Sequence, residues 1–294
     1  MKIKDIAVMI TLMIIGEVVF ILPFVIVRIF RPTFLTVFDI TNLELGTAFS
    51  AYGIVAMAAY FFGGPLADRF PPGRLIALSL IVTSLGGLVL ITIPNIWMLV
   101  LVYAFFGAST ILLFWSAFVK VQRQLGMVTG QGKSFGMVDA GRGLIAAFMA
   151  STSVFLLDGF LEVDAEIATR AQFTVALQWI IGLFTLVTII CALLEMLVLD
   201  HSRLIPTNDT FRFKEFRKAL SNRVIWQHAL IVMCAYVGYK CTDDFSLFAR
   251  DTFNYDDVEA AHLAAVTFWT RPLAAVICGV LADKWLTSKV VGWC

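Results

Sequence analysis

The chain has 294 residues, of which 60% are hydrophobic and 15% are charged, and its formal net charge is +1. Soluble globular domains carry about 25% charged residues, so this composition excludes an ordinary water-soluble domain and indicates a chain that lies in a lipid bilayer. A net charge this close to zero offers no electrostatic basis for binding nucleic acid.

Long apolar stretches follow one another along the chain, and each is near the length of about 20 residues with which a helix crosses a bilayer. They predict eight transmembrane helices, at residues 6–29, 45–66, 75–93, 96–119, 134–157, 174–199, 224–249 and 260–281. The first stretch is too long for the apolar core of a signal peptide, and no cleavage site follows it. We therefore expect an all-α polytopic membrane protein that retains its first helix.

The charged residues outside these stretches are unevenly distributed. If the N-terminus is cytoplasmic, fifteen of the 22 lysines and arginines fall in cytoplasmic segments, whereas the opposite loops at residues 158–166 and 251–259 carry four acidic residues each. Basic residues accumulate on the cytoplasmic side of membrane proteins. The pattern predicts a multi-pass protein of the cytoplasmic (inner) membrane with its N-terminus in the cytoplasm.

A polar stretch at residues 201–222 divides the predicted helices into an N-terminal six-helix bundle, residues 1–200, and a second block, residues 223–294. Phe213, Phe216 and Leu220 recur in this cytoplasmic linker at helical spacing, with basic residues between them. Such a pattern is typical of a short amphipathic helix in the membrane interface. A solvated linker with a few aromatic residues is the alternative, and the sequence leaves both open.

One short motif occurs twice. Gly-x-Leu-Ala-Asp, followed by a cation and an aromatic residue, begins at Gly64 and again at Gly279, and the two copies align without gaps at an offset of 215 residues. The polar and small residues that align are Gly64, Asp68, Arg69 and Arg74 in the first copy and Gly279, Asp283, Lys284 and Lys289 in the second. Each copy ends an apolar stretch, so the repeating unit is a block of membrane helices.

With six helices, a basic linker and this loop after the second and the eighth helix, the chain resembles the major facilitator superfamily of secondary transporters. The resemblance implies a major facilitator fold of twelve helices in two bundles around a central cavity. About eight of the twelve are present, because the sequence stops at Cys294, where a ninth should begin. We expect helices nine to twelve to be missing and the protein to be a monomer.

The resemblance also implies that the aligned residues of the two loops form a conformational gate at the cytoplasmic side. A carboxylate at the inner end of one helix would meet the positive N-terminal end of a helix in the other bundle. Asp283 would meet the start of helix five, near residues 132–134, whereas Asp68 would need helix eleven. Gly64 and Gly279 would allow the helices to approach closely.

Charged residues inside the predicted spans are costly, about 2.5–3.5 kcal/mol each at a helix centre, and usually face a polar cavity or a partner. The candidates are Glu17 in helix one, Asp139 and Arg142 in helix five, Lys240, Asp243 and Asp244 in helix seven, and Arg271 in helix eight. The family fold places these helices along the central cavity. We consider the three cations as substrate-binding residues and the four acids as proton-coupling groups or charge partners.

Arg142 is the first candidate for a substrate contact, because Gly141 and Gly143 on either side of it leave room for a ligand or for another helix. Its guanidinium group would hold an anionic group, and Asp139, three residues earlier on the same helix face, would orient it. An internal Arg142–Asp139 ion pair without a ligand is the alternative. Trp115 in helix four is a further cavity candidate.

The remaining candidates also have two possible roles each. Arg271 has no acid within a turn of its own helix, so it either contacts substrate or is reached by Glu17 or by an acid of helix seven. Lys240 is followed by Asp243 and Asp244 at helical spacing, which favours a local ion pair over a substrate contact. Glu17 is either a proton carrier or a fixed partner of an arginine.

These features predict a secondary active transporter that moves a small organic anion, such as a sugar acid or a sugar phosphate, by alternating access, coupled to protons or to exchange of a counter-anion. Residues 114–120 and 131–144 are similar to the organophosphate and anionic-sugar permeases of the family. The alternatives are a non-transporting membrane sensor or scaffold derived from a transporter, or an inactive fragment.

The sequence lacks the motifs that are typical of several other classes of protein. The sequence has no G-x-S-x-G, no H-E-x-x-H and no P-loop, and its five cysteines and three histidines are scattered. We therefore expect no enzyme activity, no metal site and no cofactor. The expected partners are a small solute and the lipid bilayer.

Overall fold

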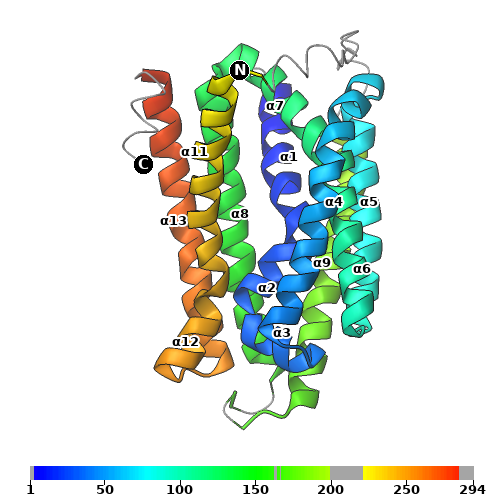
Figure 1. Cartoon of the computed structure of the whole chain (residues 1–294), viewed down its shortest axis with the longest axis vertical. Helices are drawn as coiled ribbons and strands as arrows, with labels where there is room; N and C mark the ends of the chain where they lie inside the picture. Colours follow the sequence, from blue (N-terminus) through cyan, green and yellow to red (C-terminus); the bar gives the residue numbers. More distant parts are fainter. Residues whose placement is uncertain (1–2, 162–163, 166, 199–220, 285–294) are drawn as a thin grey trace.

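The computed structural model of the chain describes residues 3–161, 164–165, 167–198 and 221–284 (Figure 1). All regular secondary structure in these ranges is helical, and the long helices run side by side. This is the all-α membrane architecture that the apolar stretches predict. We call the end of the bundle at which α1 begins the N-terminal end, and the opposite end the far end.

The first span is assembled from three helical pieces. They are α1 (Ile3–Phe20), the π-helical turn η1 (Ile21–Val25) and α2 (Ile26–Ile29), after which α3 (Arg31–Phe38) follows at the far end. Pro23 lies in the π-helical turn, where its missing N–H leaves a break in the α-helical hydrogen bonds. Together the three pieces form the predicted span Ile6–Ile29.

The chain then continues as long helices up to residue 198. They are α4 (Asn42–Arg69), α5 (Pro72–Ile91), α6 (Ile96–Gly107), the π-helical segment η2 (Ala108–Trp115), α7 (Ser116–Thr129), α8 (Gln131–Phe160) and α9 (Arg170–Val198). α4 and α8 extend three residues beyond the predicted apolar stretches at both ends, and α7 ends ten residues beyond the predicted stretch 96–119. At α4 the extra turn is capped by the Thr41 side chain, which accepts a hydrogen bond from the Glu44 N–H.

The last described part comprises α11 (Arg223–Lys240), the 3₁₀ turn η3 (Cys241–Asp244), α12 (Phe245–Phe253) and α13 (Asp257–Lys284). The predicted span 224–249 is therefore not one helix, because it breaks at the charged turn after Lys240. Of the described helices, seven are long and apolar enough to cross a membrane, and α11 is not among them. The difference from the eight expected arises because α11 begins and ends with a cation and includes Gln227 and His228.

The amphipathic helix considered for residues 201–222 lies outside the described residues, apart from the last two positions. Of these, Asn222 caps α11, since its side-chain oxygen accepts a hydrogen bond from the Val224 N–H at 3.0 Å.

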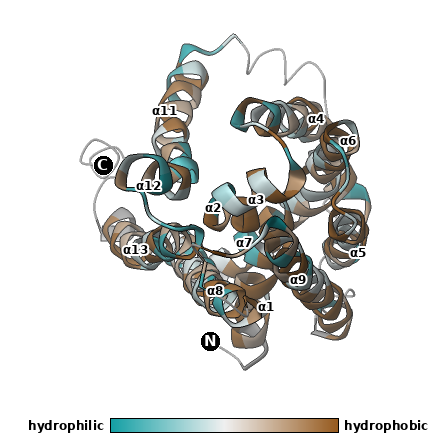
Figure 2. Ribbon diagram, turned by 90° about the horizontal axis from the view of Figure 1, so that it is seen from below, coloured by the Kyte–Doolittle hydropathy of each residue, from teal (hydrophilic) through white to brown (hydrophobic). Residues whose placement is uncertain are grey.

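Of the seven membrane-length spans among the described helices, the first is the most deeply buried. In the apolar 18-residue window of the span Ile6–Ile29, 67% of the residues are buried, compared with 28% in the window of α4. Leu12, Ile15 and Val19 are fully covered by neighbouring helices. Seen from the far end, α8 and α13 lie side by side, whereas α11 stands at the edge and has no buried side chain (Figure 2).

The sequence repeat extends into the structure. α13 begins and ends 215 residues after α4, and α12 ends 215 residues after α3. Asp39 and Asn254, at the same offset, have φ of 57° and 56° and close the preceding helices in the left-handed conformation. The same pair of hydrogen bonds caps each long helix, between Thr41 and Glu44 in the first copy and between Asp256 and Glu259 in the second. The two copies therefore have the same structure, a short helix followed by a capped long helix.

Candidate functional site

Four charged side chains from three helices meet near the middle of the bundle. This central network consists of Glu17 on α1, Asp139 and Arg142 on α8, and Arg271 on α13. Arg142 Nη2 lies 3.4 Å from Glu17 Oε2, and Arg142 Nη1 lies 3.3 Å from Asp139 Oδ1. Arg271 Nη1 lies 3.4 Å from the same Glu17 oxygen, and its Nη2 donates to Asp139 Oδ1 at 2.9 Å. Each arginine thus contacts both acids.

Close helix packing brings these side chains together. A Cβ at Gly141 would overlap the side chain of Met13 on α1, and a Cβ at Gly143 would lie 3.0 Å from Pro272 on α13. α8 is therefore held between α1 and α13 at the level of Arg142. The room predicted beside Arg142 is filled by two neighbouring helices, and these helices supply Glu17 and Arg271.

Aromatic rings surround the guanidinium group of Arg142. Its central carbon lies 5.8 Å from the ring centroids of Trp115 and Phe118 and 5.9 Å from that of Phe20. Its Nε donates a hydrogen bond to the Gly16 carbonyl at 3.0 Å. Ring faces attract cations, so the rings hold the guanidinium group in place without neutralising it. Trp115, considered as a cavity residue, is one of these rings.

The exposed fractions of the four charged side chains differ. Glu17 is 4% exposed, Arg142 11% and Arg271 22%, whereas Asp139 is 43% exposed. With two cations and two carboxylates, the central network has no formal net charge. Among the residues that the structure describes, no group of three His, Cys, Asp or Glu side chains could hold a metal ion.

The geometry bears on the alternatives that the sequence left open. The Arg142–Asp139 ion pair is present, but it is part of a larger network. Acids from two other helices, Glu17 and Asp139, reach Arg271, whose own helix offers none within a turn. Glu17 contacts both arginines, which is the arrangement expected of a charge partner.

A second group of charges lies closer to the far end. This far-end network consists of Arg28 on α2, Arg31 on α3, Lys240 on α11, and Asp243 and Asp244 on η3. Arg28 Nε donates to Asp243 Oδ1 at 2.6 Å, and Arg28 Nη1 donates to the Tyr239 hydroxyl at 2.8 Å. Arg31 Nη2 lies 3.0 Å from Asp244 Oδ1, and Lys240 contacts Asp243.

In the far-end network, the two acids predicted to pair with Lys240 contact different cations. Asp243 forms the local ion pair with Lys240, whereas Asp244 pairs with Arg31. Arg28 and Arg31 are not among the residues predicted from the sequence, because a cation at the end of an apolar stretch is common and carries no signal by itself. The available signal was spacing, since Arg28 and Asp243 are 215 residues apart, which is the offset of the repeat.

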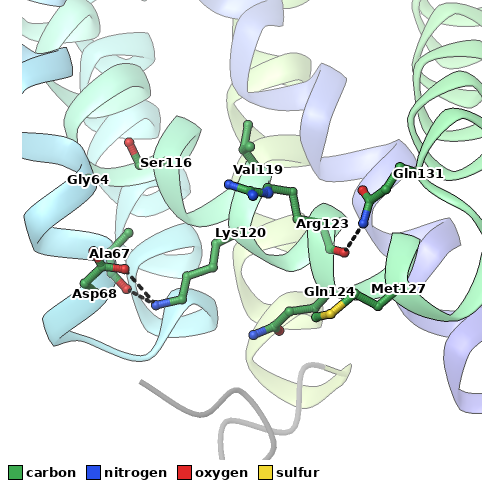
Figure 3. Close-up of a pocket in the computed structure, with 10 residues that line it drawn as sticks. All are labelled: Gly64, Ala67, Asp68, Ser116, Val119, Lys120, Arg123, Gln124, Met127 and Gln131. Atoms are coloured by element: carbon green, nitrogen blue, oxygen red, sulfur yellow. Dashed lines mark hydrogen bonds and ion pairs between the residues drawn. The ribbon is translucent and has the colours of Figure 1, made fainter. Parts of the chain in front are cut away.

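At the N-terminal end, the first copy of the repeated loop lines a pocket of about 470 Å³ between α4, α7 and α8 (Figure 3). Lys120 Nζ donates to Asp68 Oδ1 at 3.1 Å and to the Ala67 carbonyl at 3.0 Å. Asp68, for which the resemblance requires helix eleven, therefore contacts a lysine of its own bundle. Arg69 and Arg74 are exposed on either side of the loop.

The second copy of the loop follows a tight helix contact. A Cβ at Gly279 would lie 2.8 Å from the Gly136 Cα and 3.2 Å from the Gly132 carbonyl oxygen. The end of α13 therefore lies beside the start of α8, which is the place predicted for Asp283. The side chains of Asp283 and Lys284, and Lys289 as a whole, lie outside what the structure describes, so the latch stays a prediction.

Comparisons with known proteins agree with this architecture. The sequence model of the Major Facilitator Superfamily matches residues 7–293. The chain is 24% identical over 256 residues to inner membrane protein YqcE of Escherichia coli (strain K12), covering 85% of this chain and 57% of that protein. It is 23% identical over 258 residues to inner membrane protein YihN of the same organism, covering 85% and 59%. The chain thus spans less than two thirds of these curated relatives.

The family match extends over almost the whole chain, and the described helices form a polytopic bundle with the duplicated hairpin that such a match implies. The chain belongs to the Major Facilitator Superfamily.

Proposed function

We propose that the chain functions as a secondary active transporter of a small organic anion, such as a sugar acid or a sugar phosphate, in the inner membrane. Membership of the Major Facilitator Superfamily supports transport rather than an enzymatic reaction. The names of YqcE and YihN as inner membrane proteins support the location. In this proposal the bundles of residues 1–200 and 223–294 rock about a solute site near the middle of the membrane.

The observation that carries the substrate class is the approach of Arg142 and Arg271 from neighbouring helices to the same two carboxylates. Two guanidinium forks that already hold carboxylates have the geometry to hold the carboxylate or phosphate of a solute. Trp115, next to Arg142, offers an aromatic face against which the apolar side of a sugar ring packs. Lys240 belongs to the far-end network and is a weaker candidate for direct contact.

The balanced charge of the central network supports coupling to protons. An anion that binds there adds a negative charge to a site whose two cations are already neutralised, and such a charge is costly inside a membrane. A proton taken up by Glu17 or Asp139 removes that cost. Exchange for a counter-anion is the second mode of coupling, and it needs no change in the protonation of either acid.

The two repeated loops would supply the gate at the cytoplasmic side. Asp283 is proposed to meet the N-terminal end of α8, because Gly279, one turn earlier, packs on Gly132 and Gly136. Lys120, which holds Asp68, is proposed to release it when the bundles move.

Uptake into proteoliposomes tests the proposal. The full chain is reconstituted, and entry of radiolabelled glucuronate and of glucose 6-phosphate is measured with and without an inward proton gradient. We expect uptake of at least one probe, stimulation by the gradient, and a loss of most uptake in Arg142→Ala and Arg271→Ala. Arg170→Ala is the matched control, since it removes a half-exposed cation at the far end that lies outside both networks.

Two results would contradict the proposal. If uptake of both probes stays at the level of protein-free liposomes, anionic sugars are not the substrate class. Equal uptake by the parent protein and by Arg142→Ala would remove the central network as the binding site. Stimulation by a trapped counter-anion without any effect of the proton gradient would replace proton coupling by exchange.

A further inference from the structure

The far-end network joins two positions that the repeat makes equivalent. Arg28 and Asp243 are 215 residues apart, which is the offset that relates α4 to α13 and Asp39 to Asn254. The two halves of this fold are related by a pseudo-two-fold axis along the membrane normal. A residue can touch its own equivalent only where it lies next to that axis. The Arg28–Asp243 contact therefore marks the axis at the far end of the bundle.

If both copies of the repeat carried the same charged residue at this place, two like charges would lie side by side and repel each other. Here one copy carries Arg28 and the other carries Asp243, so the contact at the axis is an attraction. Both side chains are largely buried, with 7% and 10% of their surface exposed. A buried ion pair of this kind holds its geometry firmly, because separating it leaves a charge without a partner in a medium of low dielectric.

The surrounding contacts strengthen the same connection. Arg31 donates from Nη1 to the Asp243 carbonyl at 3.2 Å and pairs with Asp244. Ser246 Oγ donates to the Arg28 carbonyl at 3.1 Å, and its side chain is fully buried. The guanidinium group of Arg28 also lies 4.7 Å from the centroid of the Tyr239 ring. Each of these contacts joins the segment α2–α3 to residues of the segment α11–α12.

We propose that Arg28, Arg31, Asp243 and Asp244 form an ion-pair lock across the pseudo-two-fold axis, which holds the far end of the bundle closed. The inference rests on the proposed function, because a closed end matters only if a solute passes through it. Passage at the far end requires α2 and α3 to move away from η3, so all of these ion pairs must separate together. The packing of α8 on α13 through Gly136 and Gly279 lies near the opposite end of the bundle and remains in place.

A buried thiol at Ser246 reports on the lock without any substrate. The variant Ser246→Cys is made in a background whose five native cysteines are replaced by serine. It is placed in lipid nanodiscs, where both membrane faces are accessible, and its rate of reaction with a membrane-impermeant maleimide is measured. With the lock intact we expect slow reaction, because the side chain at this position is fully buried.

Asp243→Asn breaks the central pair of the lock and is expected to raise the reaction rate by more than about tenfold, since burial of an unpaired Arg28 favours the open form. Asp243→Glu keeps the charge and should react slowly. Asp251→Asn is the matched control, because it removes an acid at the same end that is 60% exposed and pairs only with Arg250 among the described contacts. Substitutions at surface positions usually change such an equilibrium by no more than about twofold. A reaction rate for Asp243→Asn within about twofold of the parent rate would therefore overturn the lock.

Two further variants keep the test decisive. If Asp243→Asn does not fold, as judged by its elution in size-exclusion chromatography, Asp244→Asn takes its place, since Asp244 is half-exposed and its loss leaves the Arg28 pair intact. A faster reaction supports the lock, and an unchanged reaction overturns it. The exchange Arg28→Asp with Asp243→Arg should restore slow reaction. Because the thiol readout needs no solute, failure of the uptake experiment leaves the lock standing, and the reverse also holds.

Discussion

Replacing Arg271 by glutamine tests whether the central network acts as one unit. The substitution removes the contacts of this side chain with Glu17 at 3.4 Å and with Asp139 at 2.9 Å. Arg142 is then the only cation of the network, and it faces two carboxylates. Glu17 is the critical acid, because it is only 4% exposed and cannot compensate for the lost contact by turning to water.

The expected loss of unfolding free energy follows from how deeply the ion pairs are buried. Removing one partner of a buried ion pair costs about 3–5 kcal/mol. Arg271 and Asp139 are 22% and 43% exposed, so water reaches part of the site and the cost lies at the lower end, about 3 kcal/mol. In the double variant Glu17→Gln with Arg271→Gln, one cation and one carboxylate are lost together and the Arg142–Asp139 pair remains at 3.3 Å. We expect the double variant to recover about 2 kcal/mol of the loss.

The assay is thermal or denaturant unfolding of the parent, the two single variants and the double variant in the same detergent micelle. The coupling free energy is the difference between the loss in the double variant and the sum of the losses in the single variants. Arg170→Gln is the control, because its ion pair with Asp39 is 51% and 80% exposed and should contribute less than about 1 kcal/mol. Losses that simply add up in the double variant would refute the network.

Three further outcomes are expected. Gly136→Leu places a side chain where a Cβ already lies 2.9 Å from the Gly279 Cα, so it should cost about 1–3 kcal/mol in unfolding measurements, whereas Gly53→Leu, with open space around it, should cost nothing measurable. Thr41→Ala removes the cap of α4 and should lower protection from hydrogen exchange in its first turn by about 1 kcal/mol; unchanged protection would exclude the capping role. Trp115→Ala removes a ring 5.8 Å from the Arg142 guanidinium and should raise the KM for uptake about two- to fivefold, and an unchanged KM would place the ring outside the site.

The extent to which the sequence predicts the helices depends on their composition. The span Ile6–Ile29 is found as predicted, because a continuous apolar run has one stable arrangement in a bilayer. The interruption in the span 224–249 was missed. A count of apolar residues does not show that Lys240, Asp243 and Asp244 form ion pairs in the folded chain. These ion pairs hold a 3₁₀ turn at a place where an uninterrupted helix was expected.

The candidate site shows the same division. Glu17, Asp139, Arg142 and Arg271 could be selected one by one, because each is a charge at a depth where charges are costly. Their assembly into one network could not be predicted, since the pairs Arg142–Glu17 and Arg271–Asp139 connect helices far apart in the sequence. Arg28 was missed because it lies at the end of its apolar stretch, where the local sequence gives no reason to expect burial.

Local sequence was sufficient to determine that this chain is a membrane protein, that it contains a duplicated pair of helices, and that Glu17, Asp139, Arg142 and Arg271 lie within its apolar spans. Hydrophobicity and motif spacing are properties of neighbouring residues, so no knowledge of the fold is needed to recognise them. Only the tertiary structure decided which charges meet, because the direction of a side chain depends on how its helix is rotated and packed. Here glycines set that packing, by bringing α1, α8 and α13 close enough for two arginines and two acids to share their contacts.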